Sequence, residues 1–134
     1  MPDASPAIER LKKRPEFLAC AQAPSYAKGA VVVQARPRED GDPKIRVGFT
    51  ATKRIGGAVE RNRAKRRMRE AARLLLPQHA APGVDYVLIA RGGVISRPWD
   101  RLLDDVKSAL IRLAADRVAP HVSGPTPSET DRVP

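Results

Sequence analysis

The chain between Ile45 and Pro77 reads IRVGFTATKRIGGAVERNRAKRRMREAARLLLP, and its pattern changes in the middle. From 45 to 52 an apolar residue stands at every second position, which is typical of a strand with one buried face. Gly56 and Gly57 end this alternation. Apolar residues then recur at helical spacing until the proline, at Ala64, Met68, Ala71, Ala72 and Leu75. The spacing predicts an amphipathic helix of roughly 18 residues from about Ala58 to Leu75, stopped by Pro77.

The sequence on both sides of this stretch predicts four further elements. Valine-rich 30–36 predicts a strand joined to the first through the turn-rich 39–43, and 84–90 predicts another. Pro15 suits a first helical turn, so a short helix is expected from 14 to about 22. Pro98 opens a last helical pattern that includes Leu102, Val106 and Leu110. The order helix, strand, strand, helix, strand, helix predicts one α+β domain over residues 1–117.

The end of the chain differs in composition from this domain. Residues 118–134 show no hydrophobic periodicity and contain several prolines, at Pro120, Pro125, Pro127 and Pro134. Such a segment cannot offset its ordering entropy by burying apolar surface. We therefore predict a disordered, proline-rich tail.

Net charge is the strongest compositional feature of the chain. The formal charge is +10 and the pI about 10.6, which indicates phosphate polyanions or an anionic membrane surface as partners. No apolar run of about 18 residues or more is present to span a bilayer, and the first thirty residues lack a secretory signal. The sequence thus predicts a cytoplasmic protein with no membrane-spanning segment. The distribution of the charge favours a phosphate polyanion over a membrane surface, and no membrane partner is expected.

Most of the excess charge lies in one segment. Residues 53–73 contain nine basic residues against two acidic ones, a net charge of +7. A solvated helix face normally mixes both signs, whereas a nearly uniform cationic face is stabilised when phosphates neutralise it. Gly56 and Gly57 either let backbone N–H groups approach an anion at the helix terminus or form only a turn.

Nothing in the sequence predicts a protein active site or a metal site. Cys20 is the only cysteine, which excludes an intramolecular disulfide and a thiolate zinc cluster, and it is interpreted as a small core residue. The acid pairs Asp40–Asp42 and Asp104–Asp105 are interpreted as exposed residues that favour solubility, and His79 as an exposed loop residue. Hydrolysis of a phosphodiester by protein groups needs acids that converge from separate elements. The expected catalytic and metal-ligating residues are therefore none.

The run from Arg46 to Glu70 resembles the signature of the bacterial ribonuclease P protein component family, centred on Arg61-Asn62-Arg63. The resemblance begins at Leu11-Lys12-Lys13-Arg14-Pro15-Glu16-Phe17 and reaches about Arg117, and 86–91 matches the family's last strand. It covers about four-fifths of the chain. The ordered succession of Lys-Arg-Ile-Gly, Arg-Asn-Arg and Lys-Arg-Arg-Met-Arg-Glu makes it specific.

This resemblance implies a fold and a function. The fold is a small α/β sandwich with a central four-stranded sheet and a left-handed β-α-β crossover, an exception to the usual right-handed rule. The function is that of a holoenzyme subunit of ribonuclease P, the endoribonuclease that removes the 5′ leader of precursor tRNA. The RNA subunit carries the chemistry with magnesium ions, which the RNA and the substrate mainly bind. The family's RNA-binding positions correspond here to Lys53, Arg54, Arg61, Asn62, Arg63, Lys65, Arg66, Arg67 and Arg69.

The resemblance also implies a contact with the single-stranded leader, between the first helix and the sheet. Phe17 matches an aromatic that stacks on a leader base, and Arg46 is expected to hold leader phosphates. Positions that carry further aromatics in the family are Ala21 and either Ala30 or Val33 here. Tyr26 is a possible substitute, and Phe49 is more simply a core residue.

Two other classes of protein suit the charge equally well. A ribosomal or assembly-type RNA-binding protein shares the basic helix, and only the ordered signature disfavours it. A DNA-binding module is disfavoured because no helix-turn-helix pair or zinc-ligand spacing is present. The expected partners are ribonuclease P RNA and precursor tRNA, with no obligate protein partner.

Overall fold

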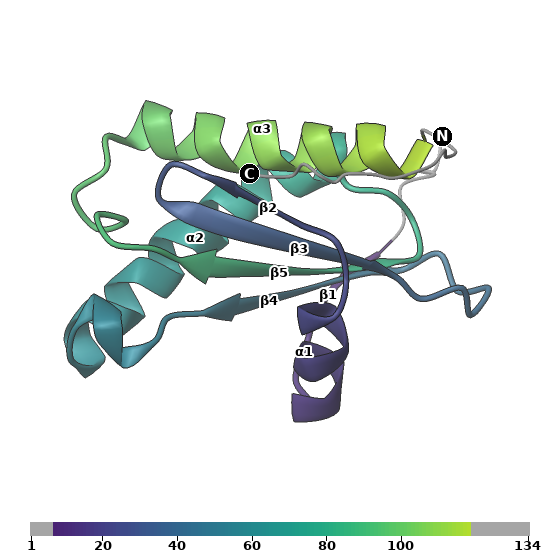
Figure 1. Ribbon diagram of the computed structural model, residues 1–134, viewed down its shortest axis with the longest axis horizontal. Helices are drawn as coiled ribbons and strands as arrows, with labels where there is room; N and C mark the ends of the chain where they lie inside the picture. Colours follow the sequence, from purple (N-terminus) through teal and green to yellow (C-terminus); the bar gives the residue numbers. More distant parts are fainter. Residues whose placement is uncertain (1–6, 119–134) are drawn as a thin grey trace.

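The computed structural model describes residues 7–118, in which one mixed sheet is covered on both faces by helices (Figure 1). The strands are β1 (Ile8–Arg10), β2 (Ser25–Lys28), β3 (Val31–Pro37), β4 (Ile45–Thr50) and β5 (Val84–Ala90). The helices are α1 (Arg14–Ala21), α2 (Ala58–His79) and α3 (Trp99–Val118), with a single 3₁₀ turn, η1 (Lys53–Ile55), before α2. The predicted tail lies outside the described residues, apart from Val118, which ends α3.

The sheet has five strands in the order β1-β4-β5-β3-β2, so the α+β class is confirmed and the count of four strands is wrong. β1 adds to one edge in parallel with β4, and β2 adds to the other edge antiparallel to β3. These two strands have three and four residues. Strands of this length are too short to show a period in the sequence. They form because the neighbouring strand has backbone N–H and C=O groups that are still unpaired along its edge.

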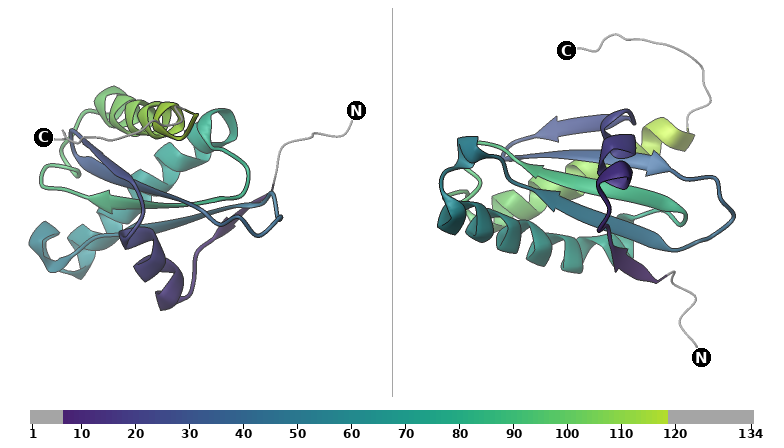
Figure 2. Two further views of the ribbon diagram at one scale, coloured as in Figure 1. Left: turned by 45° about the vertical axis from the view of Figure 1, so that its right-hand side comes forward. Right: turned by 90° about the horizontal axis from the view of Figure 1, so that it is seen from below.

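The connection from β4 through α2 to β5 is a left-handed crossover. β4 and β5 are adjacent and parallel, with Val47 paired to Tyr86 and Phe49 to Leu88. In the right-hand view of Figure 2 both strands point left, β5 lies above β4 and α1 is in front; α2 packs, with α3, against the face of the sheet turned away from the viewer. A right-handed crossover would place that helix in front of the sheet. The handedness implied by the family resemblance is therefore present in this chain.

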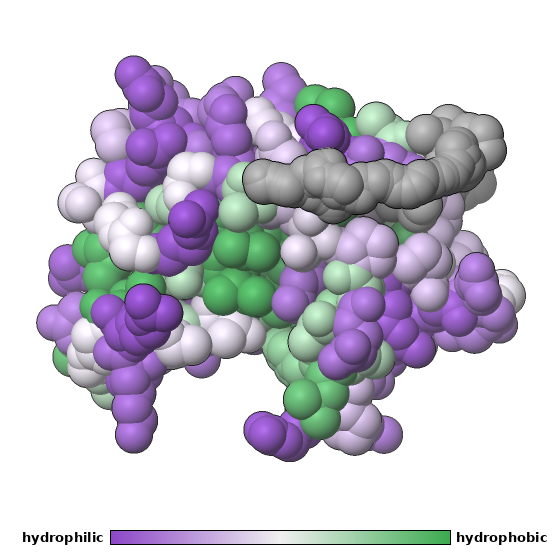
Figure 3. Space-filling model, in the orientation of Figure 1, coloured by the Kyte–Doolittle hydropathy of each residue, from purple (hydrophilic) through white to green (hydrophobic). Residues whose placement is uncertain are grey.

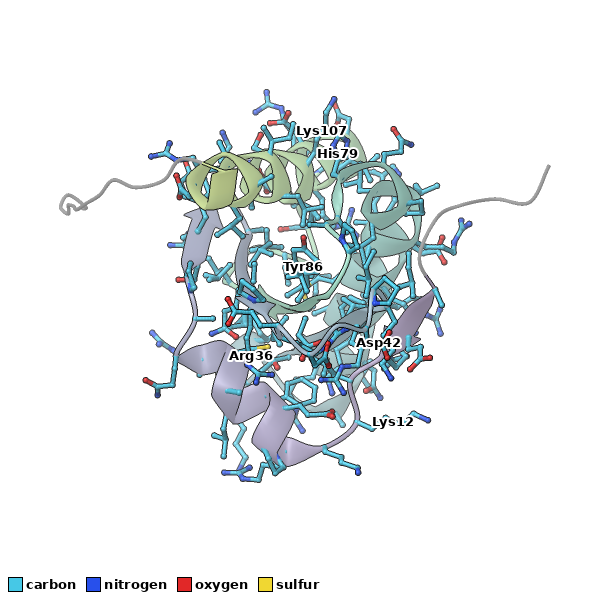
Figure 4. All side chains as sticks on the ribbon, turned by 90° about the vertical axis from the view of Figure 1, so that its right-hand side faces the viewer. Lys12, Arg36, Asp42, His79, Tyr86 and Lys107 are labelled. Atoms are coloured by element: carbon cyan, nitrogen blue, oxygen red, sulfur yellow. The ribbon has the colours of Figure 1, made fainter. Side chains whose placement is uncertain are left out.

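The main core lies between the sheet and the layer of α2 and α3. Alternate residues of the three long strands face this layer, among them Val33, Phe49 and Tyr86. Figure 4 shows Tyr86 between the sheet and these helices, and its hydroxyl accepts a hydrogen bond from Ala81 N at 2.9 Å. The predicted apolar stripe of α2 is confirmed, because Ala64, Met68, Ala71 and Ala72 are buried and Leu75 packs against the core.

Helix α2 extends past the predicted stop at Pro77 to His79. Pro77 has no N–H to donate to the carbonyl of Arg73, and only Gln78 and His79 follow it in the helix. The buried Leu76 holds the last turn against the core, and Ala80 N donates to Leu76 O at 2.9 Å. His79 is thus a half-buried helix residue, and its assignment to an exposed loop is wrong.

Helix α1 lies on the opposite face of the sheet, near β3 and β5. It forms where the sequence predicts it, with Pro15 in its first turn and Glu16 Oε1 accepting from Lys13 N at 3.3 Å. A small second cluster lies beneath it, formed by Leu11, Phe17, Cys20, Val87 and Ile89. Cys20 is fully buried, as predicted, and burial raises the pKa of its thiol to about 11.

Asp105 was interpreted as exposed, and the structure contradicts this. Its side chain is fully buried on α3 and accepts hydrogen bonds from Ala30 N at 3.0 Å and from Arg97 at 2.9 and 3.0 Å. The space that a Cβ at Gly29 would need is filled by the carboxylate, which lies 2.2 Å from that position. Asp105 therefore joins the β2–β3 turn and the 91–98 loop to α3.

Candidate RNA-binding surface

The predicted RNA-binding residues lie together on η1 and the first three turns of α2. Lys53 and Arg54 occupy η1, and the other seven lie between Arg61 and Arg69 on α2. Six of the nine are exposed and three are half-buried, namely Arg61, Lys65 and Arg67. Because the opposite side of α2 packs into the core, these side chains form one cationic surface, called here the α2 basic surface.

Two members of this surface also bind their own chain. Arg61 Nη1 donates to Gly56 O at 2.8 Å, and Arg67 Nη1 donates to Val94 O and Ile95 O, both at 2.7 Å. The Arg67 guanidinium also lies 5.7 Å from the ring centre of Trp99. Within residues 7–118, the other cations of the surface make no hydrogen bond or ion pair with protein groups. Arg69 lies close enough to Glu70 to help lower the pKa of that carboxyl, and the charge of the others is balanced by solvent ions or by a ligand.

The two glycines before α2 form a turn. Gly56 has a φ of +142°, which favours glycine, and Glu60 occupies the space beside it. The Glu60 carboxylate also lies near Gly57, where an anion at the helix terminus would have to sit. Of the two alternatives left open by the sequence, the turn is the one this geometry supports.

A second surface lies on the α1 side of the sheet. The space-filling view is notched along its lower edge, between α1 and the end of the molecule that holds η1 and the start of α2 (Figure 3). Half-buried Thr50 and Ile89 belong to the sheet face on this side. Phe17 is half-buried and packs against Gly48, where an added Cβ would lie 2.5 Å from its ring. This hollow is called here the notch.

Arg46 is placed differently from the α2 cations. Its Nε and Nη2 donate to the two oxygens of Asp85 at 2.8 and 2.7 Å, and its Nη1 donates to Glu16 Oε2 at 2.5 Å. The side chain is only 18% exposed. The sequence-based expectation that Arg46 holds leader phosphates stays a prediction, but three of its N–H groups already bind carboxylates.

Asp85 is the centre of an ion-pair network that the sequence analysis missed. Its side chain is fully buried, and Arg36 at 3.4 Å and Arg38 at 2.8 Å also donate to it. Figure 4 shows Arg36 between α1 and the sheet. Arg38 is 3% exposed and also donates to Asp40, Asp42 O and Lys44 O. One sequence signal was available, because Asp85 is the only charged residue in the apolar run 84–90.

The network predicts a specific pH dependence of stability. Burial opposes ionisation of Asp85, but hydrogen bonds from Arg46 and Arg38 prevail and hold its pKa below the ordinary 3.8. For Glu16 burial is likewise outweighed by hydrogen bonds and by Arg46, so its pKa is lowered from 4.5. Carboxylates with lowered pKa values stabilise the fold above their unfolded pKa.

We therefore expect the free energy of unfolding to stay level down to about pH 5 and to fall below about pH 4 as these carboxylates are protonated. Urea unfolding at a series of pH values measures this. The Asp85→Asn variant should lose part of the acid dependence, and an unchanged profile in that variant would contradict the assignment.

The carboxylates of the 38–44 loop are bound by the chain itself. Asp40 accepts from Arg38 and Asp42 N, and Asp42 accepts from Lys44 N, so these oxygens are engaged by the chain itself. Among residues 7–118 no three side chains of His, Cys, Asp or Glu gather in a way that could hold a metal ion. The same residues include no helix that is long and apolar enough to cross a membrane.

A small α+β fold with one predominantly cationic helix face defines this chain as a protein of the nucleic-acid-binding class. The sequence model of the Ribonuclease P family matches residues 6–114. The chain belongs to the ribonuclease P protein family, whose function is processing of the tRNA 5′ leader.

Relatives and solved structures agree with this assignment. The ribonuclease P protein component of Caulobacter vibrioides (strain NA1000 / CB15N) is 70% identical over 109 residues, which cover 81% of this chain and 73% of that protein. The Ruegeria pomeroyi protein of the same name is 53% identical over 116 residues, covering 85% and 93%. The structure of the Staphylococcus aureus RNase P protein matches with a TM-score of 0.65 and 26% identity, covering 78% and 94%. The Thermotoga maritima RNase P protein matches with a TM-score of 0.66 and 26% identity, covering 77% and 96%.

The two aromatics left open by the sequence analysis both pack against the main core. Phe49 is 8% exposed, and Arg10 lies over its ring at 5.3 Å. Tyr26 is half-buried on β2, with Arg112 over its ring at 5.3 Å. Of the three aromatic residues considered for contact with the leader, only Phe17 lies on the α1 side of the sheet, beside the notch.

Proposed function

We propose that this protein assembles with ribonuclease P RNA through the α2 basic surface and helps that RNA to remove the 5′ leader of precursor tRNA. The observation that carries the proposal is the set of cations on η1 and α2 that have no acidic partner among the described residues. Arginine forks suit phosphate oxygens, and RNA binding releases the ions that otherwise balance both partners. This role agrees with the family to which the chain belongs.

We propose that the leader lies in the notch. Both sides of the notch carry exposed cations, Lys53 and Arg54 on η1 and Lys13 and Arg14 at the start of α1. The Phe17 side chain packs between α1 and the sheet at Gly48 and is only half-buried, so part of its ring is available to a base. Single-stranded RNA is bound in general by a cationic groove with aromatic side chains on which bases stack.

We propose that the RNA carries the cleavage chemistry, with magnesium ions bound mainly by the RNA and the substrate. The acids on the protein support this division, because Asp85 and Asp105 are buried in ion pairs and Asp40 and Asp42 bind their own loop. The protein then contributes by lowering the repulsion between two polyanions. Protein cations and magnesium ions screen the same repulsion between the two RNAs. The protein should therefore stimulate cleavage most at low magnesium concentration.

The decisive experiment is cleavage of a leader-bearing precursor tRNA at low magnesium by the cognate ribonuclease P RNA, with and without this protein. We expect cleavage at the mature 5′ end only when the protein is present. Tight RNA binding without stimulation, together with co-sedimentation with a ribosomal subunit, would overturn the proposal in favour of a ribosomal assembly role. Trp99 is the only tryptophan of the chain and lies against Arg67, so its fluorescence reports assembly in the same samples.

Replacement of Phe17 by alanine is expected to raise the KM of the holoenzyme for a long-leader precursor about ten-fold, the effect of losing roughly one base–aromatic stack. A precursor with a single-nucleotide leader should be cleaved as by the wild type. Leu18→Ala is the matched control, because Leu18 lies next to Phe17 on α1 and is 54% exposed. An equal rise in KM for both precursors would show that Phe17 acts only on stability.

A further inference from the structure

Helix α1 depends on a few contacts for its position. It has eight residues, a length at which a helix is marginal unless tertiary contacts hold it. Its apolar contacts with the sheet are confined to the small cluster around Cys20 and Phe17. Glu16, the residue before Phe17, supplies a polar contact to the sheet through Arg46. The orientation of the Phe17 ring therefore depends on a charged bond one residue away.

The sheet end of this bond is held rigidly. Asp85 binds Arg46 through both carboxylate oxygens, which fixes the plane of the guanidinium. Asp85 is in turn held by Arg38, which is 3% exposed and bound at four acceptors. Since Arg46 cannot rotate without breaking the paired bonds, its Nη1 marks a fixed point to which Glu16 attaches.

The charges of this network are balanced. Arg36, Arg38 and Arg46 face three acids, Asp85, Asp40 and Glu16. A phosphate is therefore not needed to neutralise the arginines, in contrast with the α2 basic surface. A phosphate that approached Arg46 would also meet the Glu16 carboxylate, a like charge. These facts favour a positioning role for Arg46 over direct binding of the leader.

We propose that Glu16, attached through Arg46 to Asp85, is a positioning residue that sets α1 against the sheet and so places Phe17 for the leader. The inference rests on the proposed binding of the leader in the notch. A positioning acid and an acid that only lies beside the leader differ in how their removal changes the affinity for the leader. Removing an acid beside a path for RNA should tighten RNA binding by simple electrostatics. Removing a positioning acid should weaken it.

The Glu16→Gln variant tests this sign in the reconstituted holoenzyme. We expect KM for a long-leader precursor to rise about five-fold with kcat unchanged, a part of what one charge-assisted hydrogen bond contributes. KM for a single-nucleotide leader should not change. Asp116→Asn is the matched control, because it removes the same charge from an exposed Arg112 pair on α3, on the opposite face of the sheet. An unchanged or lower KM for the long leader in Glu16→Gln would overturn the inference.

Two further variants separate geometry from charge. Glu16→Asp keeps the charge but shortens the side chain, so it should raise KM for the long leader, whereas wild-type behaviour would contradict positioning. Arg46→Lys keeps the charge and loses the fork, and adding Glu16→Gln to it should bring little further change. Fully additive effects would show that Glu16 does not act through Arg46. A wild-type holoenzyme without any leader dependence would remove the proposed leader binding itself.

Discussion

Replacement of Asp85 by asparagine is expected to lower the free energy of unfolding by about 3 to 5 kcal/mol, the range for breaking a buried ion pair. The variant keeps the shape of the side chain and removes its charge. Arg38, at 3% exposure, and Arg46, at 18%, then lose the carboxylate that neutralises them inside the protein. Their remaining acceptors are backbone carbonyls and the more exposed Asp40 and Glu16.

Urea unfolding at pH 7 measures this difference. The control is Asp116→Asn, whose exposed pair with Arg112 at 3.4 Å should contribute no more than about 0.5 kcal/mol. A loss below about 1 kcal/mol for Asp85→Asn would show that solvent reaches the network and screens it. The expected loss in the free energy of unfolding is large because Asp85 is buried and because the arginines around it stay charged when its carboxylate is removed.

Joint replacement of Arg61 and Arg63 by alanine is expected to weaken assembly with ribonuclease P RNA about 100-fold at physiological salt. Two phosphate contacts at roughly 1.5 kcal/mol each give about 3 kcal/mol, or two decades in Kd. The slope of log Kd against log salt concentration should fall by about 2, roughly one for each lost contact. Filter binding or Trp99 fluorescence over a salt series measures both quantities.

The control for this variant removes two cations from another element. Arg101 and Lys107 are exposed on α3, and Lys107 lies on the outer side of that helix (Figure 4). Their joint replacement by alanine makes the same change in net charge and should weaken binding far less. Equal losses in the two variants would mean that net charge, and not the α2 basic surface, determines assembly. Arg61 also donates to Gly56 O, so the thermal stability of the first variant has to be measured alongside.

The elements predicted from periodicity are the ones that the structure confirms most closely. β5 has the predicted bounds, β4 is two residues shorter and β3 is shifted by one residue. The continuous apolar run of β5 follows from burial on both faces, since Tyr86 faces the main core and Val87 the cluster under α1, and the alternation of β4 follows from one buried face. α2 and α3 follow for the same reason. The grouping of basic residues on α2 also followed from the sequence, since helical spacing alone places them opposite the apolar stripe.

The errors share a different origin. Asp105 was interpreted as exposed because its neighbour Asp104 is also acidic, and only the approach of Gly29, Ala30 and Arg97 makes a buried carboxylate favourable there. Pro77 was interpreted as a stop because local sequence does not show that the core holds Leu76. The bonds between Arg46 and Asp85 were likewise not visible in the local sequence, because the two residues are 39 positions apart, and the leader role of Arg46 stays a prediction.

The sequence by itself determined the cationic helix, the apolar faces of the long strands and helices, and the family, because each of these is encoded in residues near one another along the chain. The tertiary structure alone decided the two edge strands, the burial of Asp85 and Asp105, and the link from Glu16 to the sheet. A short strand needs the free edge of a neighbour, and a buried charge needs a partner that surrounds it, so both depend on residues that only folding brings together.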